Sequence, residues 1–385
     1  MSGKSIAIAA FILLSQQVAL PQPATFMPPG SPASGGIVDL VLIYQGGAHR
    51  AAWTPERFQP YLSWLDPASG KEEWLFDGFL FIEFKDGMKH EYAKGYGLQP
   101  ARKQEWTWYL DRLFEKGVSL SALDARIEQT IARLGAPKRP RRVVLTLPEP
   151  IAGQTDWGEF EGRALDFTRQ ADRVAACQWY LGEIKQRWER AGLRHLELVG
   201  IYWVAEHTKG DGERILPDVA RIVHDQNLKF FWIPYWNAPG AQNWRELGFD
   251  MAYQQPNHFF HPEVADSRLD EAVAFAKRFA MGMEMEWDGR AIQNKVTFSP
   301  RFSSYLSVYK DTGVIEHAAL AHYEGGGALG DLSKSGDPDL HPLYNRYCAE
   351  IASRQRSADA GKTPAQEART TMDSDIETSA PRKVD

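Results

Sequence analysis

Two glutamates at the ends of short apolar runs have the clearest potential for chemistry. Glu206 follows the run GIYWVA, and Glu286 ends the run GMEME. A pair of carboxyl groups can cleave a glycosidic bond, because one protonates the leaving oxygen while the other attacks the anomeric carbon or activates water. Two neighbouring carboxyls also raise the pKa of one of them, which keeps that acid protonated near neutral pH. We therefore predict Glu206 as general acid/base and Glu286 as nucleophile.

Aromatic, amide and further acidic side chains occur in the same parts of the sequence. Trp and Tyr rings pack on the C–H face of a sugar, and Asn and Gln bind its hydroxyl groups. Glu284 alternates with methionines, so strand geometry sends it to the same side as Glu286. The predicted substrate-binding residues are Glu83, Trp203, Tyr235, Trp236, Asn237, Gln255, Asn257, Glu284, Trp287 and Tyr323.

Several of these acids also have a structural interpretation. Glu206 could form a surface salt bridge, Glu83 could be a satisfied core carboxylate, and Glu284 could be a buried partner of Glu286 or of a tyrosine. An unpaired buried charge would cost several kcal/mol, so we expect Glu284 to have such a partner. Glu149 and Glu324 are expected to be loop residues, the latter solvated.

Eight short apolar runs alternate with helical stretches and must position these side chains. Helices are predicted at residues 165–190, 216–226, 270–280 and 343–353. Strand–helix alternation implies parallel strands joined by right-handed crossovers, and eight such units predict an α/β fold, the single-domain (β/α)8 TIM barrel. A doubly wound sheet would show G-x-G-x-x-G after its first strand, whereas QGGAHR stands there. The predicted strands are residues 37–44, 78–84, 142–147, 196–203, 229–234, 249–254, 281–286 and 318–323.

The barrel gives these acids a common location. In barrel enzymes the active site lies at the C-terminal ends of the strands. Glu206 and Glu286 follow the fourth and seventh strands, on opposite sides of the ring, so they can face each other across a bound sugar.

The composition excludes several classes of partner. The 385 residues include 44 basic and 50 acidic side chains, a net charge of −6, which argues against binding to nucleic acid. Thirteen tryptophans are available for cores and stacking platforms. Cys177 and Cys348 fall on apolar helix faces, and we expect them to be buried free thiols.

The ends of the chain differ in composition from its middle. Residues 1–24 are predicted to be a signal peptide, because Lys4 precedes an apolar run too short to span a membrane. Residues 25–36 are predicted to be a Pro/Gly/Ser-rich linker, residues 37–355 the barrel, and residues 356–385 a disordered polar tail. This organisation predicts a secreted or periplasmic protein with no membrane span in its mature chain.

Two resemblances extend this interpretation. Acids after strands four and seven resemble those of the large clan of retaining glycoside hydrolases with a (β/α)8 fold, although Ala205 stands where that clan usually has Asn. The strings GIYWVAEH, WIPYWNAPG, GFDMAYQQPNHFF and GMEMEWD, within residues 40–351, resemble bacterial domain-of-unknown-function family 4855. That resemblance implies a TIM barrel, frequent export and a glycosidase role. From the paired acids we predict an exported glycoside hydrolase that cleaves a poly- or oligosaccharide by a retaining double displacement.

Other functions remain open at this point. A non-catalytic carbohydrate-binding or cell-surface barrel would keep the aromatic residues but use the acids structurally. The GGGALG stretch after the eighth strand could bind phosphate, with Lys334 as the nearby cation. Tyr44, Gln45 and Gly46 replace the His-x-His pair expected of metal-dependent barrel hydrolases, so we predict no metal and no cofactor.

Overall fold

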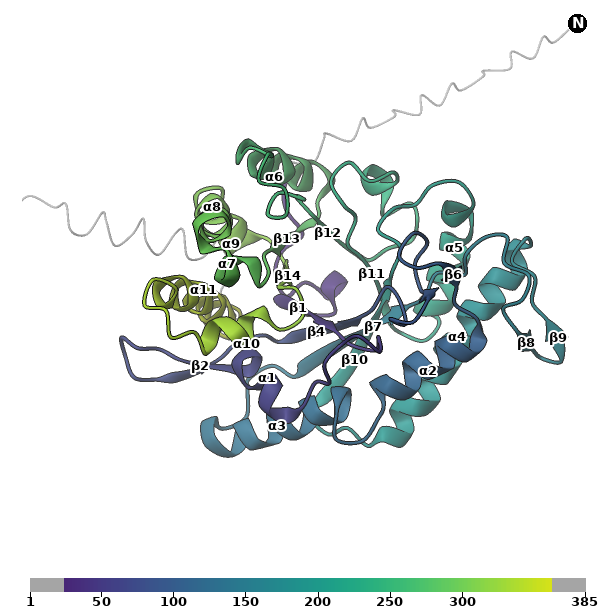
Figure 1. The fold of residues 1–385 in the computed structure, drawn as a ribbon, viewed down its shortest axis with the longest axis horizontal. Coiled ribbons are helices and arrows are strands. Elements are labelled where there is room, and N and C mark those ends of the chain that lie inside the picture. Colours follow the sequence, from purple (N-terminus) through teal and green to yellow (C-terminus); the bar gives the residue numbers. More distant parts are fainter. Residues whose placement is uncertain (1–23, 362–385) are drawn as a thin grey trace, which may run out of the picture.

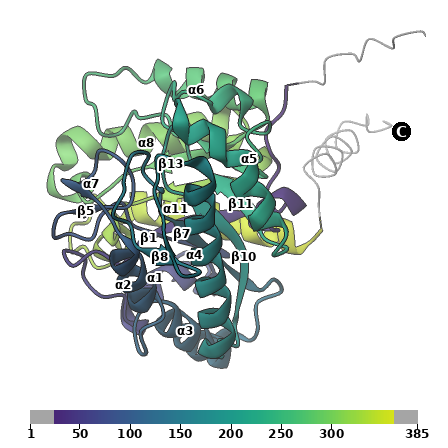
Figure 2. The same ribbon diagram turned by 90° about the vertical axis from the view of Figure 1, so that its right-hand side faces the viewer.

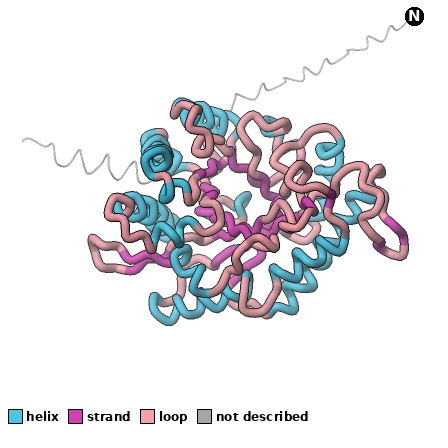
Figure 3. The backbone as a smooth tube through the Cα atoms, in the orientation of Figure 1, coloured by secondary structure: helices cyan, strands magenta, loops and turns pink. Residues whose placement is uncertain are grey.

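Eight parallel strands form a closed barrel in the structure, a computed structural model that describes residues 24–361 except the side chains of 211–213. Each strand pairs with its neighbours in chain order, and the last pairs with the first. Figures 1 and 3 show the strands as a ring surrounded by helices. The predicted barrel and its eight strands are confirmed. The strands are β1 (Asp39–Tyr44), β4 (Gly78–Ile82), β7 (Arg141–Leu147), β10 (Leu196–Trp203), β11 (Lys229–Trp232), β12 (Met251–Gln254), β13 (Gly282–Glu286) and β14 (Leu320–Tyr323).

Helices surround this ring, and four of them overlap the helices predicted from periodicity. The predicted range 165–190 begins too early, because residues 165–169 are not helical and α4 begins at Gln170. Figure 2 views the barrel from the side of α4. The α-helices are α1 (Pro55–Leu62), α2 (Lys103–Leu113), α3 (Ser119–Leu134), α4 (Gln170–Ala191), α5 (Asp211–His224), α6 (Ser267–Phe279), α7 (Arg290–Gln293), α8 (Lys295–Asp311), α9 (Val314–His317), α10 (Ala328–Ser333) and α11 (His341–Asp359). None of the described helices is both long enough and apolar enough to cross a membrane.

Three small two-stranded sheets lie outside the barrel. Two are antiparallel hairpins that project from the ring in Figure 3, and the third is a parallel pair within the long connection from β4 to β7. Their strands are only two or three residues long, too short to give a periodic pattern in the sequence. The pairs are β2 (Ser63–Leu65) with β3 (Glu72–Trp74), β8 (Glu159–Phe160) with β9 (Arg163–Ala164), and β5 (His90–Glu91) with β6 (Gln99–Pro100).

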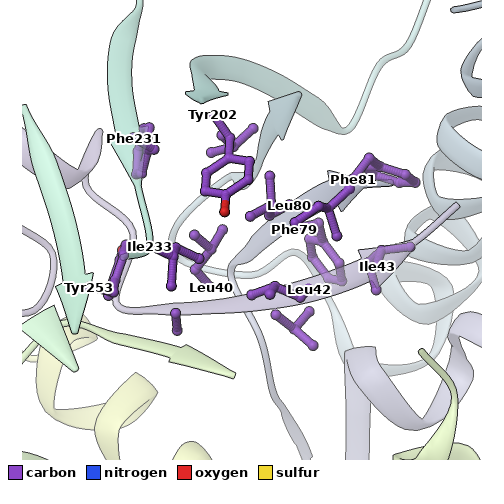
Figure 4. Packing of buried hydrophobic residues seen from close by; sticks show 14 of the residues in the cluster. Leu40, Leu42, Ile43, Phe79, Leu80, Phe81, Tyr202, Phe231, Ile233 and Tyr253 are labelled. Atoms are coloured by element: carbon purple, nitrogen blue, oxygen red, sulfur yellow. The ribbon is translucent and has the colours of Figure 1, made fainter. Parts of the chain in front are cut away.

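The barrel strands are buried on both faces, which explains why they are almost continuously apolar. Figure 4 shows Leu40, Leu80, Tyr202 and Ile233 packed together. Gly200 follows a register shift in β10, and a Cβ there would lie 2.3 Å from the Phe231 ring. A side chain at this position would collide with Phe231, so glycine is required there.

The segment before β1 packs against the barrel through Phe26 and Met27, so the predicted linker at 25–36 is corrected. Phe26 and Met27 are buried, and the backbone of Met27 bonds to Met281 O (3.0 Å) and Ala319 N (2.8 Å). A 3-10 helix, η1 (Pro32–Ser34), follows. The Pro/Gly/Ser-rich composition did not indicate this contact with the barrel, because only two apolar residues, Phe26 and Met27, make it. Residues 1–23 of the predicted signal peptide lie outside the described residues.

The predicted end of the folded unit at residue 355 is also corrected, because α11 continues to Asp359. The end of α11 is tied to the N-terminal side of the barrel, where Arg354 donates to Asp39 (2.7 Å) and Gln355 donates to Asp39 (2.8 Å) and Asp77 (3.3 Å). Burial alone would raise the pKa of Asp39, but the charge of Arg354 and the bond from His322 outweigh it and lower that pKa to about 2. Residues 362–385 of the predicted tail lie outside the described part of the chain.

Cys177 and Cys348 are both buried free thiols, as predicted. Burial raises the pKa of each thiol, which keeps both protonated.

Candidate active site

Two amide side chains from the loop after β12 join Glu206 and Glu286 at the C-terminal end of the barrel. Gln255, just after β12, donates its side-chain N–H to Glu206 Oε1 (2.7 Å). Asn257 Nδ2 donates to Gln255 Oε1 (3.1 Å) and lies 3.5 Å from Glu286 Oε1. These two amides therefore connect the acid that follows β10 with the acid that ends β13, and both acids belong to one site.

Glu286 is buried and held by fixed donors. The Tyr305 hydroxyl on α8 donates to its Oε2 (2.5 Å), as does the backbone N–H of His258 (3.3 Å). Burial raises the pKa of Glu286, and the charge of Glu206 adds to this increase. The hydrogen-bond donors act in the opposite direction, and the resulting pKa is about 7. The carboxyl can therefore change its protonation state near neutral pH while its position stays fixed.

The loop that carries His258 is fixed by Arg301 from α8. Arg301 donates to the carbonyl oxygens of Phe259 (3.2 Å), His261 (2.9 Å) and Val264 (3.1 Å), and also to that of His258. Four bonds from one guanidinium leave this loop little freedom, so the His258 N–H stays directed at Glu286.

Glu206 is half-buried and more accessible than Glu286. The Tyr96 hydroxyl and Gln255 both donate to its carboxyl. Burial raises the pKa of Glu206 in spite of these donors and of the nearby His207. Tyr96 comes from the β4–β7 connection, stacks on Phe84 (4.3 Å between centroids) and is 40% exposed.

Glu284 is buried beside these two acids, and none of the described residues forms a hydrogen bond with its carboxyl group. Burial is the largest cause of its raised pKa, followed by the charges of Glu286 and Glu206. The expected hydrogen-bond partner is therefore absent from the described residues, and burial beside two other acids disfavours the ionised form of the group. Tyr44, Tyr202 and Tyr323 lie near these acids. Burial and the nearby carboxylates raise the pKa of each of these tyrosines.

Replacing Glu284 with Gln should raise the free energy of unfolding by about 1 kcal/mol at pH 8 and have little effect at pH 4. A carboxyl whose folded pKa lies above its ordinary value of 4.5 contributes stability that is present below that value and is lost as the pH rises. Urea unfolding at both pH values measures the difference. Glu197→Gln, at an exposed position on β10, should show no such pH-dependent gain, and equal behaviour of the two variants would contradict a raised pKa at Glu284.

Trp203 and Trp287 do not form the predicted sugar platform. Trp203 is 1% exposed and packs edge-on against Phe230, and Trp287 is 0% exposed and stacks on Phe302 (4.4 Å). Each tryptophan directly follows a residue that lies near the acids, Tyr202 or Glu286, so strand alternation turns it toward the helices. The same alternation that favoured the glutamates should have excluded both tryptophans.

Glu83 was predicted to bind substrate, but its carboxylate is buried and its hydrogen bonds are satisfied within the protein. It is fully buried, and it accepts hydrogen bonds from Arg50 (2.7 and 3.2 Å) and from the backbone N–H groups of Gly47 (3.3 Å) and Phe84 (3.0 Å). These donors occupy both carboxylate oxygens.

The residues after β11 surround the rim of the site. Tyr235 is half-buried beside His207 (6.0 Å between ring centroids), whereas Trp236 packs against Phe275 of α6. Asn237 is exposed, with a left-handed backbone (φ 60°). Asn257, also left-handed (φ 48°), accepts from the Trp236 N–H (2.6 Å), so it ties the β11 and β12 loops together besides contacting Glu286.

The glycine-rich turn after β14 binds an acid of its own chain. Glu324 is fully buried and accepts from the backbone N–H groups of Gly326, Gly327 and Leu329 (2.8–3.0 Å) and from the Tyr61 hydroxyl (2.9 Å). Burial raises its pKa to about 7. The expectation of a solvated Glu324 is wrong. Its carboxyl also occupies the N–H groups that a phosphate would need, so the turn does not support the phosphate alternative.

Tyr96 and Tyr305 contact the two acids, and neither was among the predicted site residues. Tyr96 stands between glycines in KGYGL, a loop aromatic that could have been noticed. Tyr305 lies on a helix among other apolar residues and gave no signal. Among the described residues, no group of three or more His, Cys, Asp or Glu side chains has the geometry to hold a metal ion.

Comparisons with known proteins identify a family and several solved structures of low sequence identity. The family described as "Domain of unknown function (DUF4855)" matches residues 39–349. Solved structures that match include a GH113 β-1,4-mannanase (11% identity, 83% of this chain and 99% of that chain, TM-score 0.40) and a fungal β-1,4-galactanase (13%, 76% and 91%, 0.38). A mutant tryptophan synthase α-subunit from Pyrococcus furiosus also matches (11%, 85% and 100%, 0.38). No curated protein matches the chain.

Proposed function

The chain belongs to the DUF4855 family, and from the site of this member we propose an exported glycoside hydrolase that cleaves a poly- or oligosaccharide by retaining catalysis. The observation that supports this most strongly is the bridge of Gln255 and Asn257 between Glu206 and Glu286. Two carboxyls with raised pKa values at the C-terminal end of a barrel suit an acid-assisted displacement at a sugar.

Burial and contacts divide the roles between the two acids. Glu206 is half-buried with a raised pKa, which suits a group that delivers a proton to a departing oxygen and later recovers one from water. Glu286 is held by Tyr305 and His258, which suits a nucleophile that must keep its position. Burial and the neighbouring acids raise the pKa of Glu284, and it receives no hydrogen bond from the described residues, whereas the donors to Glu286 favour its ionised form.

The reaction then proceeds in two displacements. Glu206 protonates the glycosidic oxygen while Glu286 attacks the anomeric carbon, so the C–O bond to the leaving sugar breaks and a glycosyl ester forms. The Glu206 carboxylate next removes a proton from water, and this water attacks the same carbon and releases Glu286. Both inversions together retain the anomeric configuration.

Replacing Glu206 with Gln tests this function. Reducing-end release from a glycan panel should fall about 10²–10⁴-fold, because the leaving sugar loses its proton donor. On aryl glycosides with an acidic phenol, the variant should keep much more of its first-step rate, since such a leaving group departs without a proton. Steady-state and burst kinetics on both substrate types measure the contrast.

Glu149→Gln is the matched control, because Glu149 follows the neighbouring strand β7 and its carboxyl bonds to the backbone of Lys94 (2.9 Å). This variant should keep its activity. Unchanged sugar release by the Glu206 variant would refute the assignment. Glycan binding without turnover by the wild-type protein would favour a carbohydrate-binding barrel, an alternative that the buried positions of Trp203 and Trp287 already weaken.

A further inference from the structure

The connection from β4 to β7 forms a pocket next to the proposed acid. The pocket has a volume of about 460 Å³, and its lining includes His49, Lys85, Met88, Lys89, Tyr96 and Leu98. Tyr96 also donates its hydroxyl to Glu206, so the pocket adjoins the reacting groups. A volume of this size lies within the range of small-molecule sites, about 300–1,000 Å³.

The pocket presents two lysine side chains without an ion-pair partner, beside the buried carboxylate of Asp86. Lys85 and Lys89 are exposed, and neither forms an ion pair with any described residue. The two acids of the same loop are turned inward: Asp86 is buried and accepts three successive backbone N–H groups, those of residues 88–90. Glu91 accepts the N–H groups of Gly95 (2.8 Å) and Gly97 (2.9 Å). These bonds stiffen the loop and leave the two ammonium groups available to a ligand.

Apolar side chains concentrate at the same place. Met88 (64% exposed), Tyr96 (40%) and Leu98 (86%) are three of the five large apolar side chains exposed in the described part of the chain. Tyr96 is held from one side by its stacking on Phe84. Exposed apolar groups gathered on a stiff loop mark a binding surface, and a tyrosine ring is a good platform for a sugar.

We propose that this pocket is a subsite for an acidic sugar, in which Tyr96 packs against the ring while Lys85 and Lys89 pair with a carboxylate or sulfate group. The substrate would then be an anionic glycan. This inference rests on the proposed function, because that function supplies the sugar whose neighbouring bond is cleaved beside Glu206.

Binding to the catalytically disabled Glu286→Gln protein tests the subsite apart from turnover. The probes are polygalacturonate, alginate and hyaluronan, each paired with its carboxyl-reduced form, and dextran sulfate paired with dextran. At least one charged polymer should bind about ten-fold more tightly than its neutral partner, with an affinity that falls as salt is added. The two arms separate carboxylate from sulfate recognition.

Adding Lys85→Met and Lys89→Met to that protein should remove the preference. The matched control carries Lys71→Met and Lys116→Met, two exposed lysines outside this pocket, which changes the net charge equally and should keep the preference. The subsite is refuted if no charged polymer is preferred, or if the Lys85/Lys89 variant binds like the control.

Turnover by the unmodified protein separates the two proposals. If the protein cleaves only neutral glycans and the Lys85/Lys89 changes do not alter this cleavage, the proposed subsite is refuted and the proposed hydrolase function is supported. If charged polymers bind in a lysine-dependent way and no glycan is cleaved, the hydrolase fails and the acidic-glycan site stands.

Discussion

Replacing Glu286 with Gln should reduce turnover of any glycan that the wild-type protein cleaves by about 10³-fold or more, while the fold persists. The amide cannot attack the anomeric carbon, so no glycosyl ester forms. The melting temperature should stay nearly unchanged, because burial already raises the pKa of Glu286 to about 7 and a neutral side chain suits its surroundings. Reducing-end assays and thermal melting on the same sample measure both effects.

Two further measurements separate a nucleophile from other roles of Glu286. Proton NMR of the first product should show retention of the anomeric configuration. In a Glu286→Ala variant, azide should restore activity and form a glycosyl azide of inverted configuration, because azide fills the space that the carboxylate left. Unaltered turnover by Glu286→Gln would rule out a catalytic role. Inversion in the wild-type reaction would make Glu286 a base that activates water.

Replacing Arg354 with Met should lower the free energy of unfolding by about 3–5 kcal/mol at pH 7. Arg354 pairs with the fully buried Asp39 (2.7 Å) and donates to the carbonyl oxygens of Val38 (3.1 Å) and Ala318 (2.9 Å). The substitution leaves a buried carboxylate without its strongest partner. It also removes the Arg354 donor from the carbonyl oxygens of Val38 and Ala318, of which Val38 keeps the backbone N–H of Leu320 (3.2 Å). The loss is large because these groups cannot reach water in the folded protein.

The pH dependence of stability gives this prediction a second signature. The folded pKa of Asp39 is lowered to about 2 from its ordinary 3.8, so its contribution is present above pH 3.8 and is lost as the pH falls toward 2. The Arg354 variant should lose less stability over that interval than the wild-type protein. Arg221→Met, which breaks an exposed pair with Asp218 (3.5 Å), should cost less than about 1 kcal/mol. Equal losses for Arg354→Met and Arg221→Met in urea unfolding would contradict the prediction.

The residues around Glu286 show how far prediction of the site could go. Its position at the end of a strand follows from a local pattern, the alternation of Glu284 and Glu286 with methionines. Its contact with Asn257 follows in outline, because Asn257 comes just after the preceding strand. Its contact with Tyr305 does not, because the hydroxyl reaches it from a helix whose rotation about its axis depends on packing.

The amino-acid sequence by itself determined the closed barrel, the order of its strands and the strand ends at which Glu206 and Glu286 lie. These are consequences of local periodicity and of burial on both strand faces. Only the tertiary structure decided that Tyr96 bonds to an acid 110 positions away, that Glu324 occupies the glycine-rich turn, and that Met27 is anchored to the barrel. Such contacts join segments far apart in the chain, and their energies depend on burial that no local pattern records.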